Sequence, residues 1–314
     1  MTLSARLMGF VMVCLALLLF GCSPQSAPAA IQLSELQPLP PTSETGITPL
    51  RVAIAAVLSP QGTVESYQPL LDYMSAQLNR PIELVQRRTY EEINALIEQG
   101  MVDVAFVCTG AYVAGSRDFG MELLAGPQVN GESVYYSYLI VPASSPAAGL
   151  ADLQGKTFAF TDPMSMTGYF YPSFLVHELG YDTRSFFART FFTYSHDKAI
   201  SAVASGIADG AAVDSLVYDA AVAQNPELAR QTRIVHQSPP FGIPPVVVNP
   251  ATRPQIKAEL QRLLLDLANT PEGREVLKPI GFERFVTLQD SDYDSVRQVM
   301  STIPTDYNIL EASR

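Results

Sequence analysis

The feature that most constrains the fold of this chain is an internal repeat with an offset of 106 residues. Residues 91–112 (EEINALIEQGMVDVAFVCTGAY) and 197–218 (DKAISAVASGIADGAAVDSLVY) share a helical stretch, a glycine and an aspartate three residues later. Gly100 matches Gly206, and Tyr112 falls opposite Tyr218. The alternative is chance similarity added to ordinary α/β patterning. Because the match needs no gaps, it favours two lobes that are related to each other.

Apolar strands alternate with amphipathic helices in both halves of the chain. The strands are expected at 50–58, 82–86, 102–107, 121–125, 135–141, 157–161, 187–193, 210–213 and 246–249. The helices are expected at 64–78, 90–99, 167–179, 197–205, 216–223, 254–268, 271–277 and 292–301. This alternation predicts an α/β protein in which each lobe is a mostly parallel sheet flanked by helices.

The expected division follows changes in composition. It places a signal peptide at 1–21, a disordered tether at 22–49, the first lobe at 50–142 plus 246–314, and the second lobe at 143–245. The Pro/Ser/Ala stretch at 142–149 and the segment SPPFGIPP at 238–245 are interpreted as the two crossings between lobes, near 142 and 240. Two crossings at one waist allow hinge closure around a ligand.

The N-terminus reads as a targeting segment. Arg6 precedes an apolar run from Leu7 to Phe20, which is short for a membrane span of about 20 residues. Small Gly21 stands immediately before Cys22. This pattern resembles a bacterial lipoprotein signal, which predicts lipidation of Cys22; the alternative is a secretory signal with an incidental cysteine.

Net charge limits the classes of partner that the chain can bind, and cysteine content limits the disulfides that it can form. The 314 residues carry a formal net charge of −11, with 47% hydrophobic and 16% charged residues. Such a balance supports sizeable cores and argues against nucleic acid as a partner. Of three cysteines, Cys14 lies in the leader and Cys22 at the anchor, so only Cys108 is left in the body and no internal disulfide is expected.

Ligands of open α/β sheets sit beyond the carboxyl ends of the strands. The loops at those ends are 59–62, 108–112, 162–168 and 214–218. If the two lobes face each other, these loops line a ligand cleft between them.

The loop DPMSMTG at 162–168 offers Ser165 and Thr167 at the start of a helix. Unpaired backbone N–H groups and the helix dipole favour an oxyanion at such a place. Ser59 matches Ser165 at the 106-residue offset. The alternative is a capped turn that binds no ligand.

Four further residues are candidate ligand contacts. His196 could donate from Nε2 to an anion, or serve as an exposed polar cap. Tyr90 and Tyr112 are candidate hydroxyl donors, although tyrosine is also a common wall residue. Asp214 could accept a proton from a protonated tetrahedral oxyanion, or from an amine, or cap a helix. Cys108 reads most simply as a small buried apolar residue.

Enzymatic and metal chemistry find little support. Ser165, His196 and Asp214 are the residue types of a triad, but the chain has no G-x-S-x-G elbow and their order is unusual. No nucleotide-binding G-x-x-x-x-G-K-[ST] loop occurs, and the histidines lack metal-ligand spacing. We therefore expect no catalysis, no cofactor and no metal.

The motifs taken together resemble those of the periplasmic substrate-binding proteins of phosphate/phosphite/phosphonate ABC importers. They are GMVD at 100–103 with GAY at 110–112, DP-x-S-x-[ST]-G at 162–168, SHD at 195–197, and PP before Val246. The resemblance spans about residues 50–269. It implies a two-lobe type II periplasmic-binding-protein fold, and no enzyme activity.

The resemblance also implies roles for residues of this chain. The oxyanion cradle of the family falls on Ser165, Thr167 and nearby backbone amides. His196, Tyr90, Tyr112 and Asp214 fall on its ligand-contacting positions. The middle of the S-T-S loop of the family is Met166 here, which removes a hydroxyl and makes a ligand with an apolar or sulfur-containing portion more plausible.

These observations predict a lipid-anchored, extracytoplasmic solute-binding protein that captures a small oxyanion and delivers it to an ABC permease in the inner membrane. A monomer is expected. Two alternatives are kept: an accessory lipoprotein that senses ligand and signals to a partner, and an enzyme built on the same two-lobe fold.

Overall fold

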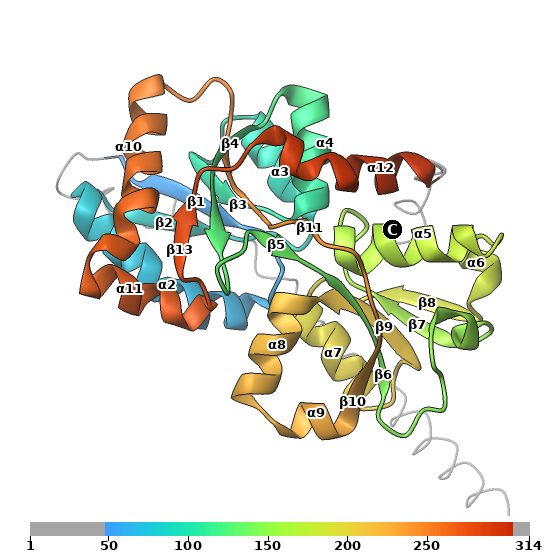
Figure 1. Ribbon diagram of the computed structural model, residues 1–314. Coiled ribbons are helices and arrows are strands. Elements are labelled where there is room, and N and C mark those ends of the chain that lie inside the picture. Colours follow the sequence, from blue (N-terminus) through green and yellow to red (C-terminus); the bar gives the residue numbers. More distant parts are fainter. Residues whose placement is uncertain (1–47, 304–314) are drawn as a thin grey trace, which may run out of the picture. The chain divides into compact units, whose positions relative to one another are not determined.

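The computed structural model describes residues 48–303 (Figure 1). The expected signal peptide, Cys22, nearly all of the tether and residues 304–314 lie outside the described residues. No helix within 48–303 is long and apolar enough to cross a membrane. The described chain forms two open sheets, each with helices packed against it.

The first sheet has six strands in the order β13-β4-β12-β3-β1-β2. Their bounds are β1 Leu50–Ile54, β2 Ile82–Val85, β3 Val104–Phe106, β4 Glu122–Gln128, β12 Val246–Val248 and β13 Arg284–Val286. Strands β1, β2 and β3 pair in parallel, whereas β12 pairs antiparallel with β3 and β4, and β13 antiparallel with β4. Four strands therefore run one way and two the other.

The second sheet has five strands in the order β10-β6-β9-β7-β8. Their bounds are β6 Ser137–Pro142, β7 Thr157–Phe160, β8 Arg189–Phe192, β9 Gly210–Asp214 and β10 Thr232–Gln237. Only β6 runs against the others, because it pairs antiparallel with both β9 and β10. Both sheets are thus mostly parallel in strand direction, as the sequence predicts.

The two sheets repeat one another. The order β2-β1-β3-β12-β4 in the first corresponds to β8-β7-β9-β6-β10 in the second, and in each the strand that arrives from the other sheet is inserted antiparallel. Helix α3 (Tyr90–Glu98) and helix α7 (His196–Ala204) have bounds that differ by 106 at both ends. The internal repeat is therefore confirmed.

The paired aspartates of the repeat have the same structural task in both lobes. The backbone N–H of Arg51 donates to Asp103 Oδ2 at 2.7 Å, and the N–H of Asp103 donates back to the Arg51 carbonyl at 2.9 Å. Thr157 and Asp209 make the same two bonds, at 2.8 and 2.9 Å. Each aspartate thus satisfies an N–H group near the start of a strand, β1 in the first sheet and β7 in the second.

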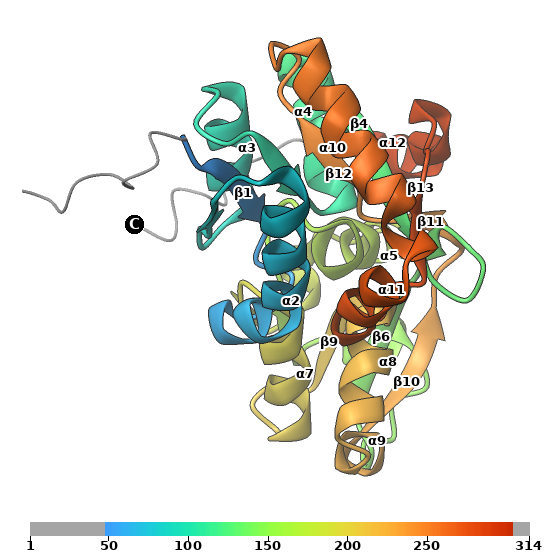
Figure 2. The same ribbon diagram turned by 90° about the vertical axis from the view of Figure 1, so that its left-hand side faces the viewer.

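Helices cover both faces of each sheet. The remaining helices are α2 Pro60–Leu78, α4 Thr109–Phe119, α5 Tyr171–Glu178, α6 Thr183–Phe186, α8 Ser215–Gln224, α9 Glu227–Gln231, α10 Pro254–Asp266, α11 Pro271–Leu277 and α12 Asp294–Thr302. Leu50, Val52 and Ile54 of β1 face the core under α2 and α10, whereas Ala53 faces α3 and α4. Figure 2 shows α10 and α11 beside the first sheet, and α7, α8 and α9 around the second.

The chain crosses between the sheets at two short paired strands. Strand β5 (Val134–Tyr135) leaves the first sheet, β11 (Phe241–Gly242) returns, and the two pair antiparallel. The second crossing lies near 240, as expected, but the first lies before Ser137 and not near 142. The expected boundary is corrected because YYSYLIV is not one strand: it breaks at Tyr136, and β6 belongs to the second sheet.

Helix α12 contacts elements of both lobes. In Figure 1 it runs between α4 and α5, and it packs against both of them. Because of these contacts, the assignment of all residues after 246 to the first lobe holds only up to this helix.

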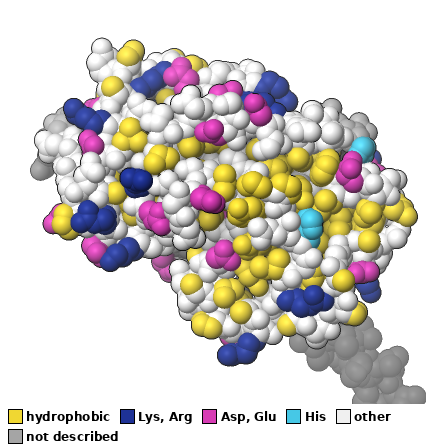
Figure 3. Space-filling model, viewed as in Figure 1, with side chains coloured by type: hydrophobic (Ala, Val, Ile, Leu, Met, Phe, Trp, Pro, Cys, Tyr) yellow, Lys and Arg dark blue, Asp and Glu magenta, His cyan; other side chains and the backbone are white. Residues whose placement is uncertain are grey.

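Figure 3 shows apolar side chains gathered in the middle and at the right of one face, with charged side chains scattered around them.

Candidate ligand-binding site

Three buried ionisable side chains mark one edge of the second sheet. Asp162, His196 and Asp214 are each 3% exposed or less, and within 48–303 no other Asp, Glu, His, Lys or Arg side chain is buried. They lie after β7, at the start of α7 and at the end of β9, which is the edge where parallel strands end. Because burying such groups is costly without partners or a function, this edge is the candidate site.

The loop 162–168 ends in a π-helical turn, Met166–Phe170. The turn begins at Ser165, whose Oγ accepts a hydrogen bond from the Gly168 N–H at 3.0 Å. This bond uses a lone pair of the hydroxyl and leaves its O–H free to donate. Ser165 therefore caps the turn and still offers a donor, so the two interpretations of the loop are compatible.

Thr167 presents an unpaired hydroxyl. Its side chain is fully buried, and its Oγ1 has no hydrogen-bond partner among the described residues. Its carbonyl is held by the Ser137 hydroxyl at 2.7 Å, which fixes the backbone here. A buried hydroxyl without a partner costs about 1–3 kcal/mol. The Thr167 hydroxyl therefore lowers the stability of the protein unless a ligand accepts a hydrogen bond from it.

His196 is a neutral hydrogen-bond donor. Its Nδ1 accepts the backbone N–H of Asp214 at 2.9 Å, which leaves the ring proton on Nε2. Burial lowers the pKa of His196 to about 3. The ring is 1% exposed, so the alternative of an exposed polar cap does not fit.

Asp214 is the N-cap of α8, which was one of its two expected roles. Its Oδ1 accepts from the N–H groups of Leu216 and Val217, at 2.7 and 3.3 Å, and so caps α8. The residue also lines a cavity between the lobes. Burial raises its pKa to about 7 in spite of the two backbone donors, so near neutral pH it can hold a proton or accept one.

Two tyrosines of the first lobe end in buried hydroxyls without a partner. Tyr90 and Tyr135 are 0% exposed, and neither hydroxyl has a hydrogen-bond partner among the described residues. Burial raises the pKa of each well above its usual value, with the nearby Cys108 and Asp214 adding to the effect. Both hydroxyls therefore stay protonated and can donate.

The sequence analysis did not name Tyr135. It lies on β5, the first crossing between lobes, and that crossing was placed near 142. Recognition of the break at Tyr136 would have placed Tyr135 at the crossing between the lobes and so among the candidate site residues.

Two predicted contacts lie apart from this cluster. The Tyr112 hydroxyl donates to Asp290 Oδ1 at 2.6 Å, and its ring packs on Tyr293. Ser59 caps α2 by accepting the Gly62 N–H at 3.4 Å, and its own N–H donates to Asp197 Oδ1 at 3.0 Å. Tyr112 thus serves the packing near α12, and Ser59 a contact between lobes.

Met166 lies where the two lobes touch. Its side chain is fully buried, and its backbone N–H lies near the thiol of Cys108, whose pKa it lowers. Burial raises the pKa of this thiol to about 11, so it stays neutral. A Cβ on Gly110 would come within 2.3 Å of the Met164 carbonyl, so only glycine fits at this contact.

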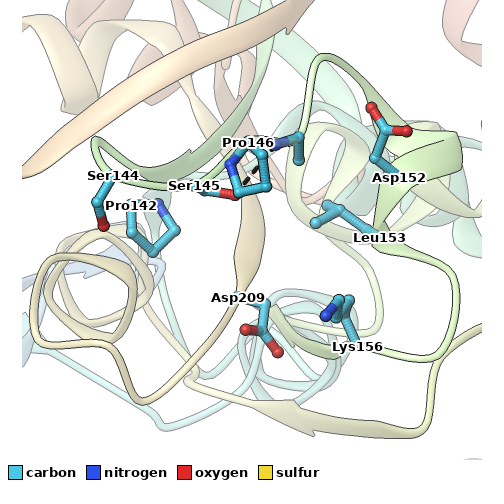
Figure 4. Close-up of a pocket in the computed structure, with 9 residues that line it drawn as sticks. Pro142, Ser144, Ser145, Pro146, Asp152, Leu153, Lys156 and Asp209 are labelled. Carbon is cyan, nitrogen blue, oxygen red and sulfur yellow. Dashed lines mark hydrogen bonds between the residues drawn. The ribbon is translucent and has the colours of Figure 1, made fainter.

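A cavity of about 230 Å³ lies between the lobes and includes Asp214 in its wall. A second hollow of about 470 Å³ lies on the second lobe alone, at the opposite edge of its sheet. Figure 4 shows Lys156 and Asp209 on one side of that hollow and Ser144 and Ser145 on the other. Since the carboxylate of Asp209 is bound to the Thr157 N–H, this hollow offers no comparable cluster of buried donors.

The chemistry of the interlobe site is that of neutral donors. Its donors are the hydroxyls of Thr167, Tyr90 and Tyr135 and the Nε2–H of His196, and burial raises the pKa of the Asp214 carboxyl to about 7. Within residues 48–303 no group of three His, Cys, Asp or Glu side chains could hold a metal ion. The arrangement suits a small anion that presents acceptors to the donors and a proton to Asp214.

Solved structures that resemble this one define its fold. The binding-protein component of an ABC phosphonate transporter from Pseudomonas aeruginosa superposes with a TM-score of 0.75, at 24% identity over 80% of this chain and 84% of that one. PhnD1 from Prochlorococcus marinus, in complex with methylphosphonate, gives 0.72 at 17% identity over 81% and 97%. The chain has the two-lobe type II periplasmic-binding-protein fold.

The family follows from the sequence comparison. The family described as ABC transporter, phosphonate, periplasmic substrate-binding protein matches residues 52–293, so the chain belongs to it. The phosphate-import protein PhnD of Mycolicibacterium smegmatis is 28% identical over 312 residues, which cover 91% of this chain and 92% of that protein. The protein is a substrate-binding component of an ABC transporter, and the resemblance inferred from the motifs is confirmed.

Proposed function

We propose that the protein captures a small tetrahedral oxyanion of the phosphonate, phosphite or phosphate type between its lobes and passes it, chemically unchanged, to an ABC permease in the inner membrane. One observation carries the proposal. The hydroxyls of Thr167, Tyr90 and Tyr135, from both lobes, are buried without a partner. A tetrahedral anion between them would accept a hydrogen bond from each of the three hydroxyls.

Within this proposal each residue has a distinct role. Ser165 and Thr167 hold two oxygens of the anion through their hydroxyls, because the N–H groups of Gly168, Tyr169 and Phe170 already bond to Ser165. His196 donates from Nε2, and Tyr90 and Tyr135 donate from the first lobe. Asp214 accepts the proton of a protonated oxygen or, when itself protonated, donates one.

Isothermal titration tests the proposal with methylphosphonate, phosphite, phosphate and methanesulfonate. We expect at least one phosphorus oxyanion to bind. Thr167→Ala and His196→Ala should each weaken binding about 10- to 100-fold, because a hydrogen bond to a charged group contributes about 1.5–3 kcal/mol. Tyr112→Phe is the matched control and should change affinity less than twofold. No heat with any of the four anions would contradict the proposal.

The proposal includes a lipid anchor on Cys22, after removal of a signal peptide at 1–21 and ahead of a tether at 22–49. It rests on the LLFGCS sequence alone. Acyl chains contribute about 0.8 kcal/mol of membrane affinity per buried methylene. The intact mass of protein extracted from membranes checks this: a chain that begins at Cys22 with added lipid is expected, and an unmodified Cys22 contradicts it.

Import by a monomer is the proposed role, and reporting of ligand to a signalling partner is its alternative. Both use the same site. Uptake of the bound anion by cells that contain the permease and ATPase, with and without this protein, separates them. Equal uptake in both strains would favour the signalling role.

A further inference from the structure

Asp162 is a buried carboxyl group that has no role in the proposed function. It follows β7 and is 1% exposed, in the same loop as Ser165 and Thr167. Burial raises its pKa to about 6, with a smaller contribution from the nearby Glu91 and Glu92 carboxylates, so the group is mainly ionised at neutral pH. A negative charge beside an anion site disfavours the anion. The position of this carboxylate therefore requires a separate explanation.

The Asp162 carboxylate joins two segments that belong to different lobes. Its Oδ1 accepts the N–H of Met164 at 2.8 Å, within residues 162–168, which we call the anion loop. Its Oδ2 accepts the N–H of Tyr90 at 3.1 Å, at the start of α3 in the first lobe. A carboxylate is a strong acceptor for the N–H groups at a helix start, where the helix dipole also favours negative charge. Asp162 thus fixes α3 against the anion loop.

Tyr90 carries a hydroxyl donor whose position depends on this bond. Its side chain is fully buried, and the hydroxyl has no hydrogen-bond partner among residues 48–303. Besides burial, Cys108, Asp162 and Asp214 are near enough to raise the pKa of the hydroxyl. The side chain turns about only two bonds, so the backbone at Tyr90 determines where the hydroxyl can reach.

The internal repeat shows that the first lobe has no equivalent of this carboxylate. His196, which matches Tyr90 in the repeat, donates its N–H across the lobes to the Val57 carbonyl at 2.9 Å. The residue that matches Asp162 in the first lobe is Ala56. A neutral main-chain acceptor is therefore sufficient to hold one helix start at the lobe contact. The charged acceptor occurs only at the helix start that carries a buried hydroxyl donor.

A second carboxylate makes the same kind of bond between the lobes but holds no such donor. Asp197 Oδ1 accepts the N–H of Ser59 at 3.0 Å, at the start of α2. Within the described residues, no side chain of α2 is among the buried polar groups that lack a partner. Asp197 therefore provides a matched comparison, in which the lobes are joined without the positioning of a hydroxyl.

We propose that Asp162 is a positioning residue for anion binding: its carboxylate joins the anion loop to the start of α3 and so holds the Tyr90 hydroxyl at the anion. The proposal rests on the proposed function, because the hydroxyl needs a fixed position only if an anion accepts its hydrogen bond. Asp162 then favours binding of the anion although it carries a charge of the same sign.

A double-mutant cycle tests this role by isothermal titration with methylphosphonate, phosphite and phosphate, of which the tightest ligand of the wild type is used for the variants. Asp162→Ala and Tyr90→Phe should each weaken binding about tenfold, as expected for one hydrogen bond to a charged group. The double variant should bind within about threefold of Tyr90→Phe, because no hydroxyl is then left to position.

Two further variants serve as controls. Asp197→Ala removes a bond of the same kind between the lobes, and its effect on affinity should be the same factor in the wild type and in Tyr90→Phe. Asp162→Asn keeps the size of the side chain and one of its two oxygen acceptors, so its affinity should lie between those of the wild type and Asp162→Ala. Thermal unfolding shows which variants fold, and Asp162→Asn replaces Asp162→Ala in the cycle if the alanine variant does not.

The outcomes separate this proposal from the proposed function. Unchanged or tighter binding by Asp162→Ala overturns the positioning role, because repulsion of the anion would then equal or exceed any gain. Unchanged binding by Tyr90→Phe overturns it as well, and so does an effect of Asp162→Ala that is equally large in the Tyr90→Phe background. The oxyanion function survives these three results. No binding of any of the three anions by the wild type overturns both.

Discussion

His196 and Asp214 lie next to each other, and burial shifts both side chains toward their neutral forms. The pKa of His196 falls to about 3, and that of Asp214 rises to about 7. No Lys or Arg within 48–303 is buried, so no buried cation is paired with Asp214. The site can therefore receive an anion with little repulsion, but only while Asp214 or the ligand supplies a proton.

The raised pKa of Asp214 predicts a pH dependence of stability. Between pH 3.8 and about 7, the carboxyl group of Asp214 is protonated in the folded protein and ionised in the unfolded chain. The free energy of unfolding therefore falls as pH rises through that window. Asp214→Asn should remove most of the fall between pH 6 and 8, as measured by urea denaturation. The window above pH 6 is chosen because Asp162, whose pKa is about 6, acts in the same direction at lower pH.

A surface carboxylate provides the control. Asp72→Asn, on the exposed side of α2, should leave the pH slope as it is in the wild type. If Asp214→Asn and Asp72→Asn give the same slope, the carboxyl of Asp214 does not titrate near neutrality in the folded protein.

Local sequence was sufficient to locate those candidate site residues whose direction is set by their own loop. Ser165, Thr167, His196 and Asp214 stand where a strand or loop meets a helix, and the structure brings them to one edge of the second sheet. Tyrosines are different, because their direction depends on packing. Tyr112 turns toward Asp290, whereas Tyr135, which was not predicted, ends in a buried hydroxyl without a hydrogen-bond partner among residues 48–303.

Among the elements, the π-helical turn at Met166–Phe170 differs most from its repeat partner. Ser165 and Ser59 cap their turns in the same way, each by accepting the N–H of the glycine three residues later. In the first lobe a regular helix follows, α2, whereas in the second the chain first makes a π-helical turn. The turn brings Gly168 against Thr161, so the repeat supplies a matched pair of glycines.

Alanine at these two glycines should change the stability by different amounts. A Cβ on Gly168 would lie 1.8 Å from Thr161 Oγ1, so the turn must move, whereas a Cβ on Gly62 meets its nearest atom, Ser59 Oγ, at 3.3 Å. Gly168→Ala should lower the free energy of unfolding by about 1–3 kcal/mol. Gly62→Ala should change it by less than about 1 kcal/mol, since alanine also favours the helix.

Chemical denaturation of both variants checks this prediction. A Gly168→Ala variant as stable as Gly62→Ala would mean that the turn accommodates a side chain. Titration with methylphosphonate adds a second comparison, because a shifted turn should also weaken the binding that Ser165 and Thr167 support.

The order of the elements was predictable because apolar strands and capped helices can be recognised from local sequence. The first crossing was not predictable, because the apolar run that contains it is continuous and shows no break in the sequence. Tyr135 and Ser137 belong to different strands only because β5 pairs with β11 and β6 pairs with β9 and β10. Such pairing joins segments that are distant in sequence, and no local pattern encodes it.

At the scale of the whole described body, the two lobes contact each other through equivalent residues. The N–H of Tyr90 donates to Asp162 Oδ2 at 3.1 Å, and the N–H of His196, its repeat partner, donates to the Val57 carbonyl at 2.9 Å. Arg88 and Tyr194, also repeat partners, stack on each other with 4.2 Å between the guanidinium carbon and the ring centre. Each lobe thus contributes the start of one helix to the contact around the site.

A crystal structure of the protein with methylphosphonate is the most direct test of the central claim. We predict the phosphonate group between the two lobes, with its oxygens within hydrogen-bond distance of Thr167 Oγ1, His196 Nε2 and at least one of the Tyr90 and Tyr135 hydroxyls. A phosphonate bound elsewhere, or one that leaves all of these hydroxyls without a partner, would contradict the account.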